Sequence, residues 1–140
     1  MNIRNRKGPL LGTCAFALAA LLGANSEAAQ TPQTVTSECT TDATGLDGVR
    51  HDCDSQPTIV TAPAGYVFIQ NAVSGGETSG NGDEHACRTS WSEYVEVVQG
   101  TGITQPRTFS LQSHARSPSG HASGRGWSVC SYALLITQYK

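Results

Sequence analysis

Residues 107–114 read RTFSLQSH and alternate small or apolar side chains with polar ones. In an extended chain, Phe109 and Leu111 point to one side, whereas Gln112 and His114 point to the other. A period of two over a run of this length is typical of a strand with one buried face and one solvated face. The stretch therefore predicts a half-buried β-strand.

Similar runs rich in β-branched and aromatic residues recur along the chain, bounded by Gly, Pro, Asn and Ser. The expected strands are residues 33–37, 58–61, 66–73, 91–99, 107–114 and 127–139, with a further hairpin around Asp47-Gly48. The last strand is apolar on both faces, which predicts a place near the middle of a sheet. The expected fold class is all-β: a small disulfide-bonded antiparallel β-sandwich or partly open barrel of about six to eight strands.

Two stretches rich in Gly, Ser and Pro separate these strands. Residues 74–84 read SGGETSGNGDE, and residues 115–126 read ARSPSGHASGRG. Such residues supply little apolar area to offset the backbone entropy lost on folding. Both stretches are expected to be surface loops, and long loops on a rigid β scaffold are where binding residues often lie.

The N-terminus has the order of a secretory signal peptide. Arg4, Arg6 and Lys7 precede an apolar run over residues 10–24, which is shorter than the roughly 20 residues that a membrane-spanning helix needs. Small residues near position 28 suit signal peptidase, so we expect cleavage after Ala28.

This cleavage divides the chain into a signal peptide, residues 1–28, and a single β domain, residues 29–140. Residues 29–37 are expected to begin the domain as a loose N-terminal arm, because they are polar and contain Pro32. The expected location is periplasmic or secreted, with no membrane span in the mature chain.

The mature chain keeps four of the five cysteines: Cys39, Cys53, Cys87 and Cys130. An even number in an oxidising compartment predicts a disulfide framework, and four cysteines allow three connectivities that sequence alone does not separate. The pairing we favour joins Cys39 to Cys53 and Cys87 to Cys130.

The mature chain is mildly acidic, with six basic residues against ten acidic ones and a formal net charge of −4. This balance does not favour nucleic acid as a partner. The acids all lie within residues 38–96, whereas residues 97–140 hold arginines, a lysine and histidines without any acid. The charge is therefore strongly asymmetric along the sequence.

The basic residues within 97–140 suggest a ligand site. His114, Arg116, His121 and Arg125 lie in or beside the loop of residues 115–126 and are our candidate ligand-binding residues. Gathered together, they would suit an anion such as phosphate, sulfate or an acidic sugar. The alternative, which we favour, is that the arginines form surface ion pairs with acids such as Glu93 or Glu96.

Two His-x-Cys units suggest a metal site as a second hypothesis. His51 with Cys53 and His85 with Cys87 would each present an imidazole and a thiolate on one face of a strand. Together they form a set of ligands that zinc or copper accepts. Disulfide formation is the favoured interpretation, because exported cysteines normally oxidise.

The chain has no nucleophile elbow, zinc-protease helix, phosphate loop or dinucleotide fingerprint. A Ser/His/Asp set assembled in space from His114 or His121 stays open, since such sets are recognised by geometry. The aromatic residues Trp91, Trp127, Tyr66 and Tyr94 suit either core packing, which we favour, or a platform for a sugar or peptide.

The sequence therefore favours an exported β-sandwich that binds a protein, a glycan or an anionic ligand, without catalytic activity and without a cofactor. The expected contact surface is the loop of residues 115–126. A small extracytoplasmic hydrolase and a periplasmic metal-binding protein are the two alternatives.

Overall fold

The computed structural model describes residues 32–140, so the signal peptide predicted for residues 1–28 lies outside the described residues. The described chain forms nine strands and one short 3-10 helix: β1 (Gln33–Thr40), β2 (Asp52–Asp54), β3 (Thr58–Thr61), β4 (Tyr66–Phe68), η1 (Gln70–Ala72), β5 (Ser74–Asn81), β6 (Glu84–Val98), β7 (Ile103–Arg116), β8 (Trp127–Leu134) and β9 (Ile136–Gln138). The all-β prediction is confirmed. No helix within residues 32–140 has the length and apolarity needed to cross a membrane.

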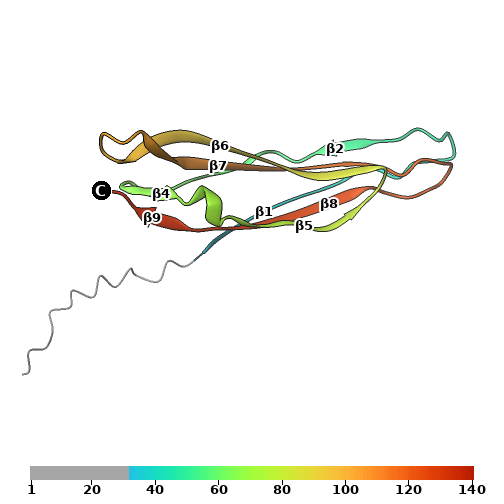
Figure 1. Ribbon diagram of the computed structural model, residues 1–140. Helices are drawn as coiled ribbons and strands as arrows, with labels where there is room; N and C mark the ends of the chain where they lie inside the picture. Colours follow the sequence, from blue (N-terminus) through green and yellow to red (C-terminus); the bar gives the residue numbers. More distant parts are fainter. Residues whose placement is uncertain (1–31) are drawn as a thin grey trace, which may run out of the picture.

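The strands form two main layers (Figure 1). One layer has the order β1-β8-β5, and the other has β7 at its centre, with β6 along one side and the short strands β2 and β3 along the other. A two-stranded sheet, β4-β9, lies at the end of the molecule that carries the C-terminus. All pairings are antiparallel. This is an elongated β-sandwich, and β8 is central in its sheet, as expected from its two apolar faces.

The core lies between the layers. Phe109 and Leu111 of β7 are fully buried and pack in one cluster with Phe68 and Leu134. The Trp91 ring stacks at a tilt on Phe109, with ring centroids 4.7 Å apart. The buried face predicted for residues 107–114 is therefore confirmed, and large aromatic side chains fill much of a small core.

Both disulfides connect the two layers. Cys39 of β1 is bonded to Cys53 of β2, and Cys87 of β6 is bonded to Cys130 of β8. The favoured pairing is confirmed. Two disulfides are consistent with an oxidising, extracytoplasmic environment.

The prediction of a loop over residues 74–84 is wrong, because β5 occupies most of this stretch. β5 pairs with β8 from Ser74↔Ala133 to Asn81↔Trp127. The glycines permit this pairing: a Cβ on Gly75 would overlap the Ser131 carbonyl oxygen on β8. Backbone hydrogen bonds, rather than apolar side chains, hold this strand in place.

Other boundaries also differ from those expected. The strand of residues 91–99 begins earlier, at Glu84, and the strand of residues 107–114 extends from Ile103 to Arg116, two residues into the stretch expected as a loop. The strand of residues 66–73 ends at Phe68, since η1 follows it and leads into β5, which pairs with β8. The strand of residues 127–139 is two strands, because the chain leaves β1 and β5 after Leu134 and pairs with β4 instead. Asp47-Gly48 forms a turn closed by the Gly48 N–H and the Gly45 carbonyl, without a hairpin. The expected arm of residues 29–37 is ordered from Gln33, where β1 begins.

Candidate functional site: a charged cluster and a paired-loop end

Two of the predicted ligand-binding residues, His114 and Arg116, lie on the outer face of β7. The neighbouring strands place acids beside them: Asp52 on β2 and Glu84 on β6 are both in register with Arg116. Asp54 on β2 is in register with His114. The side chains of one sheet face thus form a cluster of alternating charge, because cross-strand neighbours on the same face lie within contact distance.

Arg116 is fully engaged by these acids. Its Nε and Nη2 donate to the two carboxylate oxygens of Asp52 at 2.7 and 3.2 Å, and its Nη1 donates to Glu84 at 3.2 Å. The hydrogen bonds from Arg116 lower the pKa of Asp52, and Asp52 in turn raises the pKa of Arg116. The guanidinium therefore has little capacity left for an anionic ligand.

The favoured ion-pair interpretation holds for Arg116, although its partners are not those suggested. Glu93 instead accepts a hydrogen bond from the Thr108 hydroxyl, and Glu96 accepts one from the Gly102 N–H. Both lie on the β6–β7 hairpin, and the register of β6 keeps them away from Arg116.

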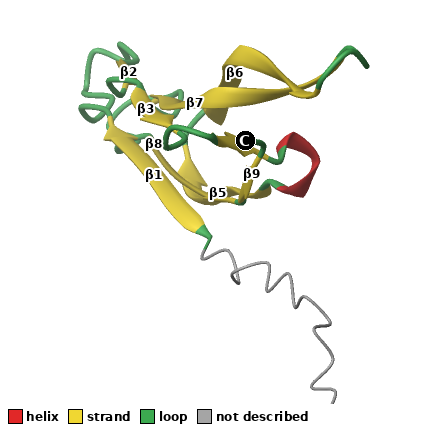
Figure 2. Ribbon diagram, turned by 90° about the vertical axis from the view of Figure 1, so that its left-hand side faces the viewer, coloured by secondary structure: helices red, strands yellow, loops and turns green. Residues whose placement is uncertain are grey.

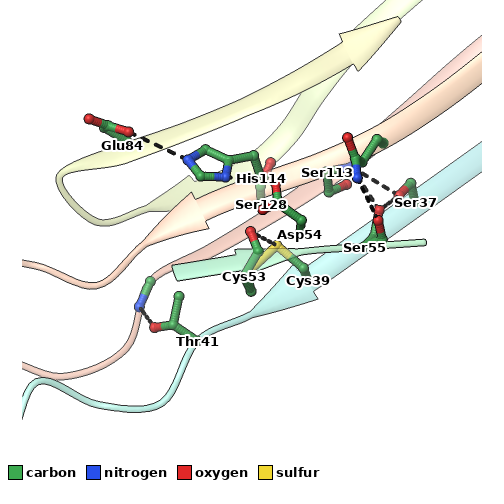
Figure 3. The surroundings of a disulfide bond; sticks show 12 residues. Ser37, Cys39, Thr41, Cys53, Asp54, Ser55, Glu84, Ser113, His114 and Ser128 are labelled. Carbon is green, nitrogen blue, oxygen red and sulfur yellow. Dashed lines mark hydrogen bonds and ion pairs between the residues drawn. A yellow bond between two sulfur atoms is a disulfide. The ribbon is translucent and has the colours of Figure 1, made fainter. Parts of the chain in front are cut away.

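His114 lies at the centre of the cluster with 8% of its surface exposed. Its Nδ1 is 2.9 Å from Asp54, and its Nε2 is 3.4 Å from Glu84, whose carboxylate is directed at the ring (Figure 3). Arg88 also donates to Asp54, at 3.0 Å. Both ring nitrogens of His114 therefore face carboxylates.

A further ion pair borders the cluster. Arg50 donates to Asp83 at 2.6 Å, and the Ser119 N–H donates to the other carboxylate oxygen at 3.1 Å. Both donors lower the pKa of Asp83, with Arg50 as the larger cause. Acids and arginines from three strands and their loops are thus interleaved on one face.

Next to the cluster, two loops, residues 41–51 and 117–126, pair to form one end of the sandwich, which we call the loop end. The Thr44 N–H donates to the Gly124 carbonyl at 2.8 Å, and the Ala122 N–H donates to the Gly45 carbonyl at 2.9 Å. The buried hydroxyls of Thr44 and Ser117 lie 2.6 Å apart. These contacts fix the two loops against each other (right-hand side of Figure 1).

The outer surface of the loop end carries the other two predicted residues, His121 and Arg125. His121 contacts the Leu46 carbonyl oxygen through Nδ1 at 2.8 Å. The Arg125 side chain is exposed and forms no ion pair with any residue in 32–140. Leu46 is 85% exposed, and Val49 is 52% exposed. The four predicted residues are therefore divided between the cluster and the loop end.

The two His-x-Cys units do not come together. Cys53 and Cys87 are in separate disulfides, so neither supplies a thiolate ligand. β2 and β6 lie on opposite sides of β7, and His85 contacts Glu77 of β5. Across residues 32–140, no three His, Cys, Asp or Glu side chains are grouped so that they could hold a metal ion.

The geometry that would favour a hydrolase is not found in the described part of the chain. Within residues 32–140, no serine hydroxyl is hydrogen-bonded to a histidine ring nitrogen, and the rings of His114, His85 and His121 contact carboxylates or a carbonyl. The aromatic residues are divided: Trp91 and Tyr66 pack on the core, whereas Trp127 and Tyr94 are exposed.

A polar groove of about 310 Å³ lies along β1, on the side of the molecule away from β5. Its lining consists of Thr36, Ser37, Glu38, Ser55, Gln56, Thr58 and Val129. Sequence reasoning missed this groove, and it missed the acids of the charged cluster. The alternation in DCD, residues 52–54, signals two carboxylates on one face, but their partners depend on strand register.

Comparison with known proteins adds no further assignment. No protein-family model, no curated protein and no solved structure matches this chain.

Proposed function

We propose that this chain is an exported binding protein without catalytic activity, and that the loop end is its contact surface. The observation that carries the proposal is Leu46, which is 85% exposed on a loop that is itself held in place by hydrogen bonds. Leu46 shares this loop with Val49, which is also exposed, and a fixed surface loop on a β scaffold is a common place for binding residues.

Preorganisation supports the same proposal. Binding through mobile loops costs conformational entropy, whereas loops that already hold their bound shape avoid much of that cost. The two disulfides and the hydrogen bonds between residues 41–51 and 117–126 restrict the loop end before any partner arrives.

The chemistry of the loop end favours a protein partner over an anionic one. Leu46 and Val49 suit an apolar pocket, and His121 and Arg125 beside them suit a polar rim. The cation that would have anchored an anion, Arg116, is neutralised by Asp52 and Glu84.

Site-specific photo-cross-linking tests the proposal. A photoreactive residue is placed at Leu46 or His121, and the matched control is placed at Gln99, in the exposed turn between β6 and β7. In cells that export the protein, we expect one discrete adduct from the two loop-end positions and none from Gln99. Adding Val49→Asp to the Leu46 cross-linking variant should abolish the adduct.

Adducts of equal yield from Gln99, or none from either loop-end position, would refute the loop end as the contact surface. A C-terminal affinity tag suits this experiment, because the C-terminus lies at the opposite end of the molecule (Figure 1).

A further inference from the structure

The free edges of the two sheets differ in how they are protected against pairing with another strand. β5 has a register shift between Glu77 and Ser79, and β6 has one between Glu96 and Val98. β2 and β3 are only three and four residues long. Bulges and short strands are the usual devices that prevent addition of a further strand.

β1 has none of these devices. Its eight residues pair with β8 in unbroken register from Gln33↔Leu134 to Thr40↔Trp127. The strand contains no proline, lysine or arginine, and its one charged residue is Glu38. Within residues 32–140, no strand pairs with its other edge.

The register shows which backbone groups face that edge. The Thr41 N–H donates to the Gly126 carbonyl at 2.8 Å, which continues the β1–β8 ladder by one pair. In an antiparallel edge strand, alternate residues direct both backbone groups to the partner and the others direct both away. The N–H and C=O groups of Thr34, Thr36, Glu38 and Thr40 therefore face away from β8.

The polar groove lies beside this edge. Three consecutive β1 residues form one wall, and the other includes Ser55 and Gln56, from the connection between β2 and β3, and Thr58, the first residue of β3. The Thr58 hydroxyl donates to the edge carbonyl of Thr36 across the groove, at 3.4 Å. This contact shows that the Thr36 carbonyl faces away from β8 and accepts from a donor at the edge.

Ser37 and Ser55 close the base of the groove. Their hydroxyls lie 2.7 Å apart, and both accept from the Ser113 N–H of β7 (Figure 3). The two layers are thus in contact through these serines at the groove. Figure 2 shows β1 along one side of the molecule.

The charge of the groove identifies the side chain it would accept. The Glu38 carboxylate is exposed and forms no ion pair with any residue in 32–140. The rest of the lining is uncharged, with hydroxyls and the Gln56 amide. A cation placed opposite Glu38 would gain the attraction of a cross-strand ion pair.

We propose that the free edge of β1 is a strand-addition site, which takes an extended segment of another protein carrying a lysine or arginine opposite Glu38. The backbone of that segment pairs with Thr36 and Glu38, as peptides do when they extend an exposed sheet edge. This site does not involve the loop end, so the two proposals stand or fall separately.

Hydrogen exchange measured by NMR tests the site. The probe is the blocked peptide Thr-Val-Thr-Lys-Thr-Val-Thr, and the comparison peptide has glutamate in place of the lysine. We expect the lysine peptide to slow exchange of the Thr34, Thr36, Glu38 and Thr40 amides about tenfold near saturation, because these N–H groups become hydrogen-bonded. The glutamate peptide should bind about fivefold more weakly.

Three variants separate backbone pairing from side-chain effects. Thr36→Pro removes the outward N–H and should abolish protection, whereas Thr36→Val keeps that N–H and should preserve it. Proline is tolerated where the N–H of an edge strand faces solvent. Glu38→Lys should reverse the preference between the two peptides. Because this exchange changes only a side chain, its result does not depend on whether Thr36→Pro folds.

Several outcomes would overturn the proposal: no protection by either peptide at millimolar concentration, equal protection in Thr36→Pro, or an unchanged preference in Glu38→Lys. Protection of the same amides that rises with protein concentration in the absence of peptide would also overturn it, because the occupant would then be a second copy of this chain.

Discussion

Arg116 connects three strands through its side chain alone. It lies on β7 and contacts Asp52 of β2 and Glu84 of β6, so the guanidinium bridges strands on both sides of the one that carries it. The bidentate contact with Asp52 uses the planar geometry of arginine, which lysine does not reproduce. This residue therefore sets the arrangement of the charged cluster.

The lowered pKa of Asp52 makes the stability of the fold depend on acid pH. Because its folded-state pKa lies below the ordinary 3.8, its contribution is present above that value and is lost as the pH falls through the folded-state pKa. Asp52→Asn should lower the melting temperature at pH 7, and the difference from the unmodified protein should shrink as the pH falls below 3.8 through the folded-state pKa.

Calorimetry from pH 7 downward measures this effect. Asp42→Asn is the matched control, because the Asp42 side chain forms no ion pair within residues 32–140. A difference between Asp52→Asn and the unmodified protein that stays constant across the range would contradict the prediction.

Gly82 and Gly100 allow a second test at the residue scale. Both have positive φ angles, of 119° and 77°, but a Cβ on Gly82 would overlap the Arg116 carbonyl oxygen, whereas a Cβ on Gly100 would meet open space. Gly100→Ala should cost about 1 kcal/mol through backbone strain. Gly82→Ala should cost about 3 kcal/mol, since steric overlap adds to the strain. Urea unfolding measures both losses of stability. Equal losses would contradict a steric overlap between the Cβ at position 82 and the Arg116 carbonyl oxygen.

At the scale of the elements, apolar alternation was a reliable signal for strands, whereas the glycine-rich strand was not predicted. β3 was expected at its observed bounds, and the buried face of β7 was expected from Phe109 and Leu111. β5 has no such signal, because SGGETSGN offers almost no apolar side chain and pairs with β8 through its backbone. Composition alone does not reveal a strand of this kind.

The candidate sites were only partly predictable for a similar reason. His114 and Arg116 stood out as cations, but their partners lie on β2 and β6, and the sequence does not specify that register. The β1 groove depends on which edge is left free, and that too is a property of strand order. Residue type identified the cations of the cluster, whereas the strand order and register determined their partners.

The two disulfides should contribute unequally to stability. The cysteines are 14 residues apart in the first and 43 apart in the second. In the chain-entropy model, the bonds are worth about 3 and about 4 kcal/mol respectively. Replacing Cys87 and Cys130 by alanine should therefore destabilise the protein more than replacing Cys39 and Cys53.

The loss in the Cys87/Cys130 variant should also include a packing term, because Cys130 is fully buried in the core. Urea unfolding of the two double variants gives the comparison. A larger loss in the Cys39/Cys53 variant would contradict the prediction.

At the scale of the whole molecule, the predicted export is tested by intact mass. The exported protein should begin at Ala29, and its denatured mass should be four hydrogens below that of the reduced chain. Mass spectrometry before and after reduction measures both quantities. A mass that retains residues 1–28, or one that shows free thiols at Cys53 and Cys87, would contradict the prediction.

The proposed contact surfaces are separated on the molecule. The loop end lies at one extremity of the sandwich, the β6–β7 turn at the other, and the free edge of β1 along the side between them (Figures 1 and 2). A partner on the loop end therefore leaves the edge of β1 open to a second protein.

The positions of the disulfides have a consequence for resistance to proteolysis. Residues 40–52 lie between the first pair of linked cysteines, and residues 88–129 lie between the second. Both loops of the loop end and the exposed turn at residues 99–102 thus fall within covalently closed rings. A protease that cuts once in any of them releases no fragment, so the nicked chain stays in one piece with its strands in place.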